Sequence, residues 1–110
     1  MNPDTATLQE CCLALSDFIR TGWRDGYLGG EHPFTEAELM IVCPVKPTLD
    51  DIRKALPPGW DWERISFTGT VSVYVSKFDP YQRVISDGIL EDLARARAAV
   101  KCWMIVKGEA

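Results

Sequence analysis

The stretch WERISFTGTVSVYVSK, residues 62–77, decides the fold class, because it predicts two β-strands joined by a tight turn. Valines recur at every second position over residues 71–75, which is the period of a strand with one buried face. Thr68-Gly69 is the turn signal between the two strands. The same alternation predicts a second face, open to solvent or to a partner, formed by Ser72, Tyr74 and Ser76.

The residues on either side of this hairpin extend the pattern in both directions. Residues 39–43 form an apolar run that predicts a strand buried on both faces, and residues 48–56 predict a short helix that Pro57-Pro58-Gly59 ends. After the hairpin, Asp79-Pro80 predicts the start of a helix that reaches Val100, with Glu91 and Arg95 as an i, i+4 ion pair on its solvent side. A second apolar run, residues 102–106, predicts a last strand.

The order strand, helix, strand, strand, helix, strand is that of a ferredoxin-like βαββαβ fold, which places the chain in the α+β class. We expect one antiparallel sheet in the order 4-1-3-2, with the strand of residues 39–43 in its interior. RNA-recognition motifs share this topology, but residues 70–77 lack their aromatic signature and the chain is acidic. The topology itself names no function, because this fold hosts many unrelated ones.

An additional amphipathic helix precedes this unit. An apolar stripe predicts a helix from Thr5 to Gly22, and Thr7 with Glu10 fits a capping box at its start. Because two predicted strands are apolar on both faces, we expect this helix, or else a second copy of the chain, to cover the second face of the sheet. The 110 residues form a single domain, with the helix in 1–22, a loop in 23–38 and the βαββαβ unit in 39–107.

Composition limits the possible partners. The formal net charge is −4, and residues 31–63 carry seven acids against three bases, which argues against direct binding to nucleic acid. No apolar run is long enough to span a membrane and no signal peptide is evident, so we expect a cytoplasmic protein without membrane contact. The four cysteines lack the spacing of a disulfide or zinc framework, so we expect buried free thiols and no metal or other cofactor.

No set of residues matches a known catalytic pattern. His32 is the single histidine and lies in a loop, and the glycines of residues 26–30 fit neither phosphate-binding motif. Asp61 and Glu63 are a pair of carboxylates on a predicted strand, but beside Trp60 and Trp62 such a pair is more often a surface pair next to core tryptophans than an acid–base pair. These observations argue against an enzyme.

The residues that best fit a functional site are aromatics close to the acidic middle of the chain. Tryptophan and tyrosine are enriched at protein interfaces, and an acidic rim would attract a basic partner. Tryptophans also fill cores, so a packing role is the alternative for each of them. The predicted partner-binding residues are Trp23, Tyr27, Glu36, Glu38, Asp50, Asp51, Trp60 and Asp61.

From these residues we expect a small acidic, non-catalytic protein-binding module, of the kind used as inhibitor, immunity or anti-defence proteins. Its partner would be another protein with a basic site, for example one that handles nucleic acid. The alternative is a ligand-sensing module similar in topology to ACT domains, or a small dimeric α/β-barrel-type enzyme. That alternative predicts a pocket between sheet and helices lined by Phe67, Tyr74 and Trp103. The sequence leaves open whether the chain is a monomer or a homodimer.

Overall fold

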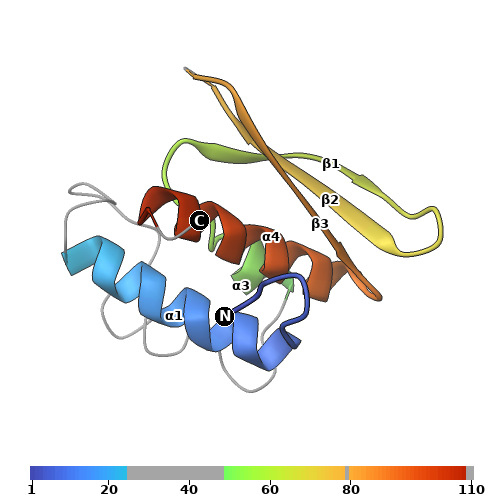
Figure 1. The fold of residues 1–110 in the computed structure, drawn as a ribbon, viewed down its shortest axis with the longest axis horizontal. Coiled ribbons are helices and arrows are strands. Elements are labelled where there is room, and N and C mark those ends of the chain that lie inside the picture. Colours follow the sequence, from blue (N-terminus) through green and yellow to red (C-terminus); the bar gives the residue numbers. More distant parts are fainter. Residues whose placement is uncertain (25–48, 79, 109–110) are drawn as a thin grey trace.

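The computed structural model describes residues 1–24, 49–78 and 80–108, and these form an α+β structure. Figure 1 shows a β-sheet, a middle layer of α4 with the short α3, and α1 on the other side of α4. The described part of the chain holds three strands, so the full βαββαβ order is not seen. The elements in chain order are α1 (Leu8–Arg24), α3 (Leu49–Arg53), β1 (Trp60–Ser66), β2 (Val71–Lys77), β3 (Gln82–Gly88) and α4 (Glu91–Val106).

The sheet is antiparallel in the order β1-β2-β3. Its first hairpin confirms the two strands predicted around Thr68-Gly69. The prediction of a helix over residues 80–90 is wrong, because Gln82–Gly88 is β3. In β3 the inward side chains alternate strictly with exposed ones, and their two-residue period was hidden by apolar residues that also fit helical spacing. The inward residues of β3 are Val84, Ser86 and Gly88.

The predicted strand over Cys102–Val106 is also wrong, because these residues form the end of α4. One side of α4 packs against the sheet with small residues, and another packs against α1 and α3. A helix buried on two sides is apolar nearly all round, so a short piece of it resembles a buried strand in sequence. The sheet side includes Ala94, Ala98 and Cys102, and the other includes Ala96, Val100 and Trp103.

Helix α1 confirms the predicted N-terminal helix, including its capping box. The backbone amide of Glu10 donates to Thr7 Oγ1 at 3.2 Å, and the amide of Thr7 donates to Glu10 Oε1 at 3.1 Å. The expectation that α1 covers the second face of the sheet is wrong. Its apolar stripe, including Cys11, Leu15 and Ile19, packs in the core that it shares with α4, on the side away from the sheet.

Helix α3 confirms the predicted short helix, and the start of α4 contains a predicted ion pair. Arg95 Nε donates to Glu91 Oε2 at 2.7 Å, and Arg53 from α3 binds the same oxygen at 3.3 Å. The predicted strand of residues 39–43 lies outside the described residues. The predicted sheet order 4-1-3-2 is wrong, because β2 pairs with β1 on one side and with β3 on the other, and the predicted fourth strand is part of α4.

Among the described strands, none pairs with the edge of β3 that faces away from β2, and two cations of α4 hold this free edge. Arg97 donates from Nη1 to the carbonyl oxygen of Asp87 at 2.9 Å, and Lys101 donates from Nζ to the carbonyl oxygen of Ile85 at 2.8 Å. The helix lies very close to β3 here, because a Cβ atom added to Gly88 would lie 2.7 Å from the backbone nitrogen of Ala94. These contacts fix the strand on the helix.

Candidate functional site on the outer face of the sheet

The face of the sheet opposite α4 is the outer face, and no described helix packs on it. Tyr74 lies at its centre on β2. In the strand register it pairs with Arg64 of β1 on one side and with Ile85 of β3 on the other. The sequence predicted this face from the alternation in β2, but it did not predict the two neighbours on the flanking strands.

Two arginines surround the Tyr74 ring. The Arg64 guanidinium carbon lies 4.2 Å from the ring centroid, and that of Arg83 lies 5.9 Å from it. Stacking of a guanidinium on an aromatic ring is a favourable cation–π contact that keeps the planar N–H groups available at its edge. Arg64 makes no ion pair with any residue in the described segments, so its N–H donors can serve a partner.

Arg83 is held by a carboxylate on the far strand. Its Nε donates to Glu63 Oε2 at 3.0 Å and its Nη2 to Glu63 Oε1 at 2.7 Å, a two-point pair that raises the pKa of Arg83. The side chain crosses β2 at Ser76, its register partner, which is small and buried. The β-bulge between Trp62 and Arg64 leaves Glu63 exposed beside Arg64, where this pair forms.

Exposed aromatics continue the outer face onto the β2–β3 turn, at the end of the hairpin that extends beyond the helices in Figure 1. Phe78 is 77% exposed and Tyr81 is 50% exposed, with their ring centroids 5.4 Å apart. Ile85 adds an aliphatic side chain that is 47% exposed. We name these residues together the outer patch: Arg64, Tyr74, Phe78, Tyr81, Arg83 and Ile85.

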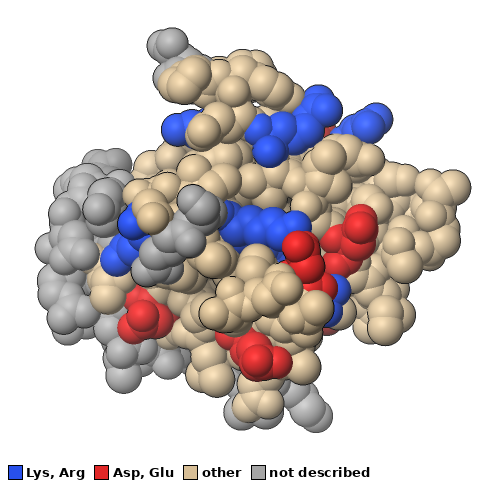
Figure 2. All heavy atoms as spheres, viewed as in Figure 1, with Lys and Arg blue, Asp and Glu red and all other residues tan. Residues whose placement is uncertain are grey.

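The charges around the outer patch are mixed. Three acids, Asp61, Glu63 and Asp87, share the face with the two arginines. Glu63 neutralises Arg83, and Asp87 accepts a hydrogen bond from Ser72 Oγ at 2.6 Å. Figure 2 shows Lys and Arg side chains over the upper layer of the molecule, which is the sheet. The outer face thus joins an aromatic and aliphatic centre to charged groups of both signs.

The predicted partner-binding residues do not form one cluster within the described residues. Trp23 lies in the last turn of α1, and Asp50 and Asp51 lie on α3, where Asp50 pairs with Arg53 at 3.6 Å. Asp61 is exposed on the outer face, on the opposite side of the sheet from α3. Tyr27, Glu36 and Glu38 lie outside the described residues.

Trp60 lies next to Asp61 on β1, but its side chain points into the core. It is 5% exposed, it packs with the valines of β2, and Lys77 Nζ lies 5.7 Å from its ring. Its Nε1 has no hydrogen-bond acceptor in the described part of the chain. Truncation of Trp60 is therefore expected to lower the stability of the protein. A loss of partner binding in such a variant tests the predicted anchor role only if the variant is shown to be folded.

The pocket that the ligand-sensing alternative predicted is not formed by the expected residues. Trp103 is fully buried between α4, α1 and α3, where its ring stacks on Phe18 with centroids 6.2 Å apart. Tyr74 lies on the opposite face of the sheet, and Phe67 is 62% exposed beyond β1. The prediction failed because it placed Trp103 on a strand.

The described cysteines are buried thiols. Burial raises the pKa of Cys11 to about 11 and that of Cys102 to about 12, so both remain protonated at neutral pH. Cys12 is buried as well, which agrees with the prediction of buried thiols, whereas Cys43 lies outside the described residues. Within the described segments, no group of three or more His, Cys, Asp or Glu side chains is placed to hold a metal ion.

The outer patch was missed by sequence reasoning except for Tyr74. The predicted helix after Asp79-Pro80 includes Arg83 and Ile85, so the sequence does not predict that they lie beside Tyr74 on the sheet. The alternation of residues 82–88 was the signal that could have placed them there. None of the described helices is long and apolar enough to cross a membrane. No protein-family model matches this chain, and comparison with curated proteins and with solved structures found no similar protein.

Proposed function

We propose that this protein is a non-catalytic protein-binding module and that the outer patch is its contact surface. The observation that carries the proposal is the arrangement on the outer face, where Tyr74 lies between Arg64 and Ile85 in register. Tyrosine and arginine are the residue types, with tryptophan, that contribute most binding free energy at protein interfaces. Exposed aromatics at the hairpin end enlarge this surface beyond isolated apolar side chains.

The charge on the outer face supports a partner protein with a basic site. Because Glu63 neutralises Arg83, the two acids Asp61 and Asp87 outnumber Arg64 and form an acidic rim around the outer patch. The formal net charge of −4 acts in the same direction at longer range. Nucleic acid is disfavoured, since open sheets that bind it present an excess of Lys and Arg to the phosphates.

The proposed protein-binding role is the one expected from the sequence, but the contact surface is now the outer face of the sheet. The partner would be a protein with a basic site, for example one that handles nucleic acid, and binding there would suit an inhibitor, immunity or anti-defence protein of the cytoplasm. The acids of the middle segment, including Asp50 and Asp51, would add to the attraction during association. Asp61 belongs to both descriptions, because it lies on the outer face.

Site-specific photo-crosslinking in the source cells tests the proposal. A benzophenone amino acid at Phe78 or Tyr81 should give a covalent adduct with one partner protein. The same group at Leu13, which is 61% exposed on α1, is the matched control and should not. The partner is then purified, and a charge introduced on the same face by Ile85→Lys should weaken its binding by tenfold or more, an order-of-magnitude expectation for a central contact.

Two results would overturn the proposal. The first is an equal adduct yield from Leu13, which would indicate non-specific encounters. The second is a partner that binds Ile85→Lys as well as it binds the parent protein, with the variant shown to be folded by circular dichroism. Reversal of Asp61 and Asp87 to Lys should also slow association, most strongly at low salt, because exposed charges are screened as ionic strength rises.

A further inference from the structure

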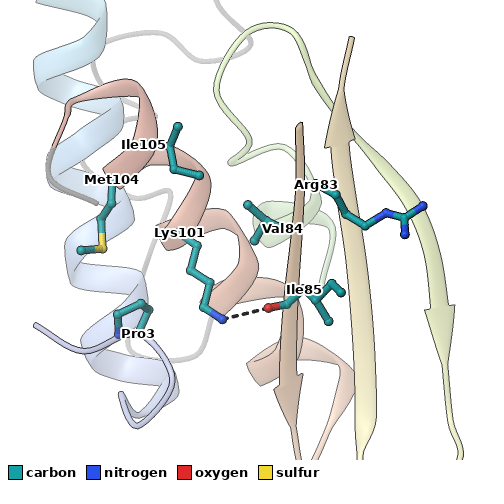
Figure 3. A pocket seen from close by; sticks show the side chains of 7 residues that line it. All are labelled: Pro3, Arg83, Val84, Ile85, Lys101, Met104 and Ile105. Atoms are coloured by element: carbon teal, nitrogen blue, oxygen red, sulfur yellow. Dashed lines mark hydrogen bonds between the residues drawn. The ribbon is translucent and has the colours of Figure 1, made fainter. Parts of the chain in front are cut away.

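A separate pocket lies between α4, the free edge of β3 and the N-terminal segment (Figure 3). Its volume is about 420 Å³, within the range of about 300–1,000 Å³ that is typical of small-molecule sites. It is on the side of β3 that faces away from β2, and two of its lining residues, Arg83 and Ile85, also belong to the outer patch. We name it the Lys101 pocket.

The walls of the Lys101 pocket are mostly apolar. Val84 is buried at its base, while Met104 and Ile105 of α4 and Pro3 of the N-terminal segment line its sides. Arg83 borders the pocket, but its guanidinium points away toward Glu63. Among the lining residues, Lys101 is therefore the one that brings a cationic group to the pocket.

The Lys101 ammonium is held at the pocket by two acceptors. It donates to the carbonyl oxygen of Ile85 at 2.8 Å, as Figure 3 shows, and it forms an ion pair with the carboxylate of Asp4. The Lys101 side chain is 22% exposed and that of Asp4 is 64% exposed. The Asp4 carboxylate, from a residue in the N-terminal segment, approaches the Lys101 ammonium from the solvent side. A carboxylate therefore already fits at this position.

We infer that the Lys101 pocket binds a small amphiphilic carboxylate. The ligand carboxylate replaces Asp4 on the Lys101 ammonium, and its apolar part packs against Val84, Met104 and Ile105. An ion pair to a well-exposed carboxylate is a weak interaction, so Asp4 is displaced at low cost. The apolar part of the ligand then supplies the binding free energy through burial against the pocket walls.

The features of the pocket select against other ligand classes. A phosphate ester would bring a second negative charge to a site with one ammonium, and that charge would remain unpaired. A cation would meet Lys101. A purely apolar molecule would leave the carboxylate position to Asp4 and gain burial alone. A ligand with one carboxylate and an apolar chain would contact both the ammonium and the apolar walls of the pocket.

Titration calorimetry with octanoate, and with 1-octanol as the uncharged probe, tests this inference on the full chain. Octanoate should bind with one site per chain. Lys101→Met should weaken octanoate at least tenfold and leave 1-octanol nearly unchanged, because methionine keeps the apolar stem and removes the charge. Lys54→Met, at an exposed lysine just beyond α3, is the matched control and should bind octanoate as the parent protein does.

Two further variants make the result unambiguous. Asp4→Asn should bind octanoate more tightly than the parent protein, because it removes the internal competitor. Ile105→Trp should fill the pocket and abolish binding of both probes without contact to the ammonium. Absence of saturable octanoate binding, equal binding by folded Lys101→Met, or unchanged binding by Asp4→Asn would each overturn the inference. None of these outcomes depends on the outer patch or on a partner protein.

Discussion

The indole nitrogen of Trp103 donates a hydrogen bond to the backbone carbonyl oxygen of Ala55, with 2.6 Å between Nε1 and the oxygen. Trp103 lies on α4, and Ala55 lies just after α3, 48 residues away in the chain. Both residues are buried, so water cannot replace either partner. This bond fixes the segment between α3 and β1 on the central helix, and it satisfies the buried indole N–H.

Trp103→Phe should lower the free energy of unfolding by about 2–4 kcal/mol, since it leaves the Ala55 carbonyl unpaired and opens a space beside Phe18. Urea denaturation followed by circular dichroism measures this loss. The matched control is Trp62→Phe, because Trp62 Nε1 donates in the same way to the carbonyl oxygen of Arg53 at 3.0 Å, but the Trp62 side chain is only partly buried. A Trp62→Phe loss as large as that of Trp103→Phe would contradict the argument from burial.

Gly88→Ala should destabilise the protein by about 1–3 kcal/mol, because the added Cβ meets backbone atoms of α4 that cannot move away independently. The nearest are the nitrogen of Ala94 at 2.7 Å and its Cα at 3.1 Å. Thermal unfolding of the two proteins side by side gives the difference. An unchanged melting temperature would mean that β3 and α4 separate without cost.

Ser86→Ala, on the same inward face of β3, should have the opposite outcome. Ser86 Oγ is buried and has no hydrogen-bond partner within the described residues. Removal of a buried hydroxyl without a partner removes a desolvation penalty, so the change should be neutral or stabilising. A clear loss of stability in the same thermal assay would show that the hydroxyl has an acceptor.

The stability of the protein should fall in acid in part through Glu91. Hydrogen bonding to Arg95, together with the smaller contribution of Arg53, holds the pKa of Glu91 below its usual value of 4.5. A carboxyl group whose pKa is lower in the folded state stabilises the fold above its unfolded pKa and loses that effect as pH falls through its folded pKa. Glu91→Gln should therefore be less stable than the parent protein at neutral pH, and the two should converge below pH 4.5. A difference that stays constant from neutral pH into acid would contradict this assignment.

The buried thiols should be slow to react in the native protein. With the pKa raised to about 11 for Cys11 and about 12 for Cys102, the thiolate that attacks an alkylating reagent is scarce at neutral pH. Iodoacetamide labelling followed by peptide mass spectrometry should show little modification of either residue before urea is added, and rapid modification afterwards. Native labelling of Cys102 at the unfolded rate would place it at the surface.

The sequence predicted the elements in which local signals agree with one another. The reciprocal hydrogen bonds of Thr7 and Glu10, the hairpin at Thr68-Gly69 and the Glu91–Arg95 pair depend on residues close in the chain, and all are present. Errors arose where burial by distant elements decides the structure. Cys102–Val106 is apolar on two sides because α4 lies between a sheet and a helix, and a five-residue run carries too little periodicity to distinguish that from a strand.

The candidate site depended on the same error. Tyr74 was correctly placed on a face away from the core, but Arg83 and Ile85 reach it only through the pairing of β2 with β3. The pairing of Arg83 with Glu63 also requires the bulge in β1, which no local sequence pattern predicts. Surface geometry that arises from register is therefore the part that the sequence alone did not supply.

Two cations of α4 bind the edge of β3 because the spacing of residues along the helix nearly equals the spacing of carbonyl groups along the strand. Arg97 and Lys101 are four residues apart on a helix, about 6.0 Å along its axis, and Asp87 and Ile85 are two residues apart on a strand, about 6.6 Å. Because the two spacings nearly coincide, the side chains meet successive outward carbonyls in step. Any strand that added here to lengthen the sheet would have to displace two charged donors from their acceptors. The helix thus acts as a stop on this edge, and it directs growth of the sheet, whether useful or pathological, to the side of β1.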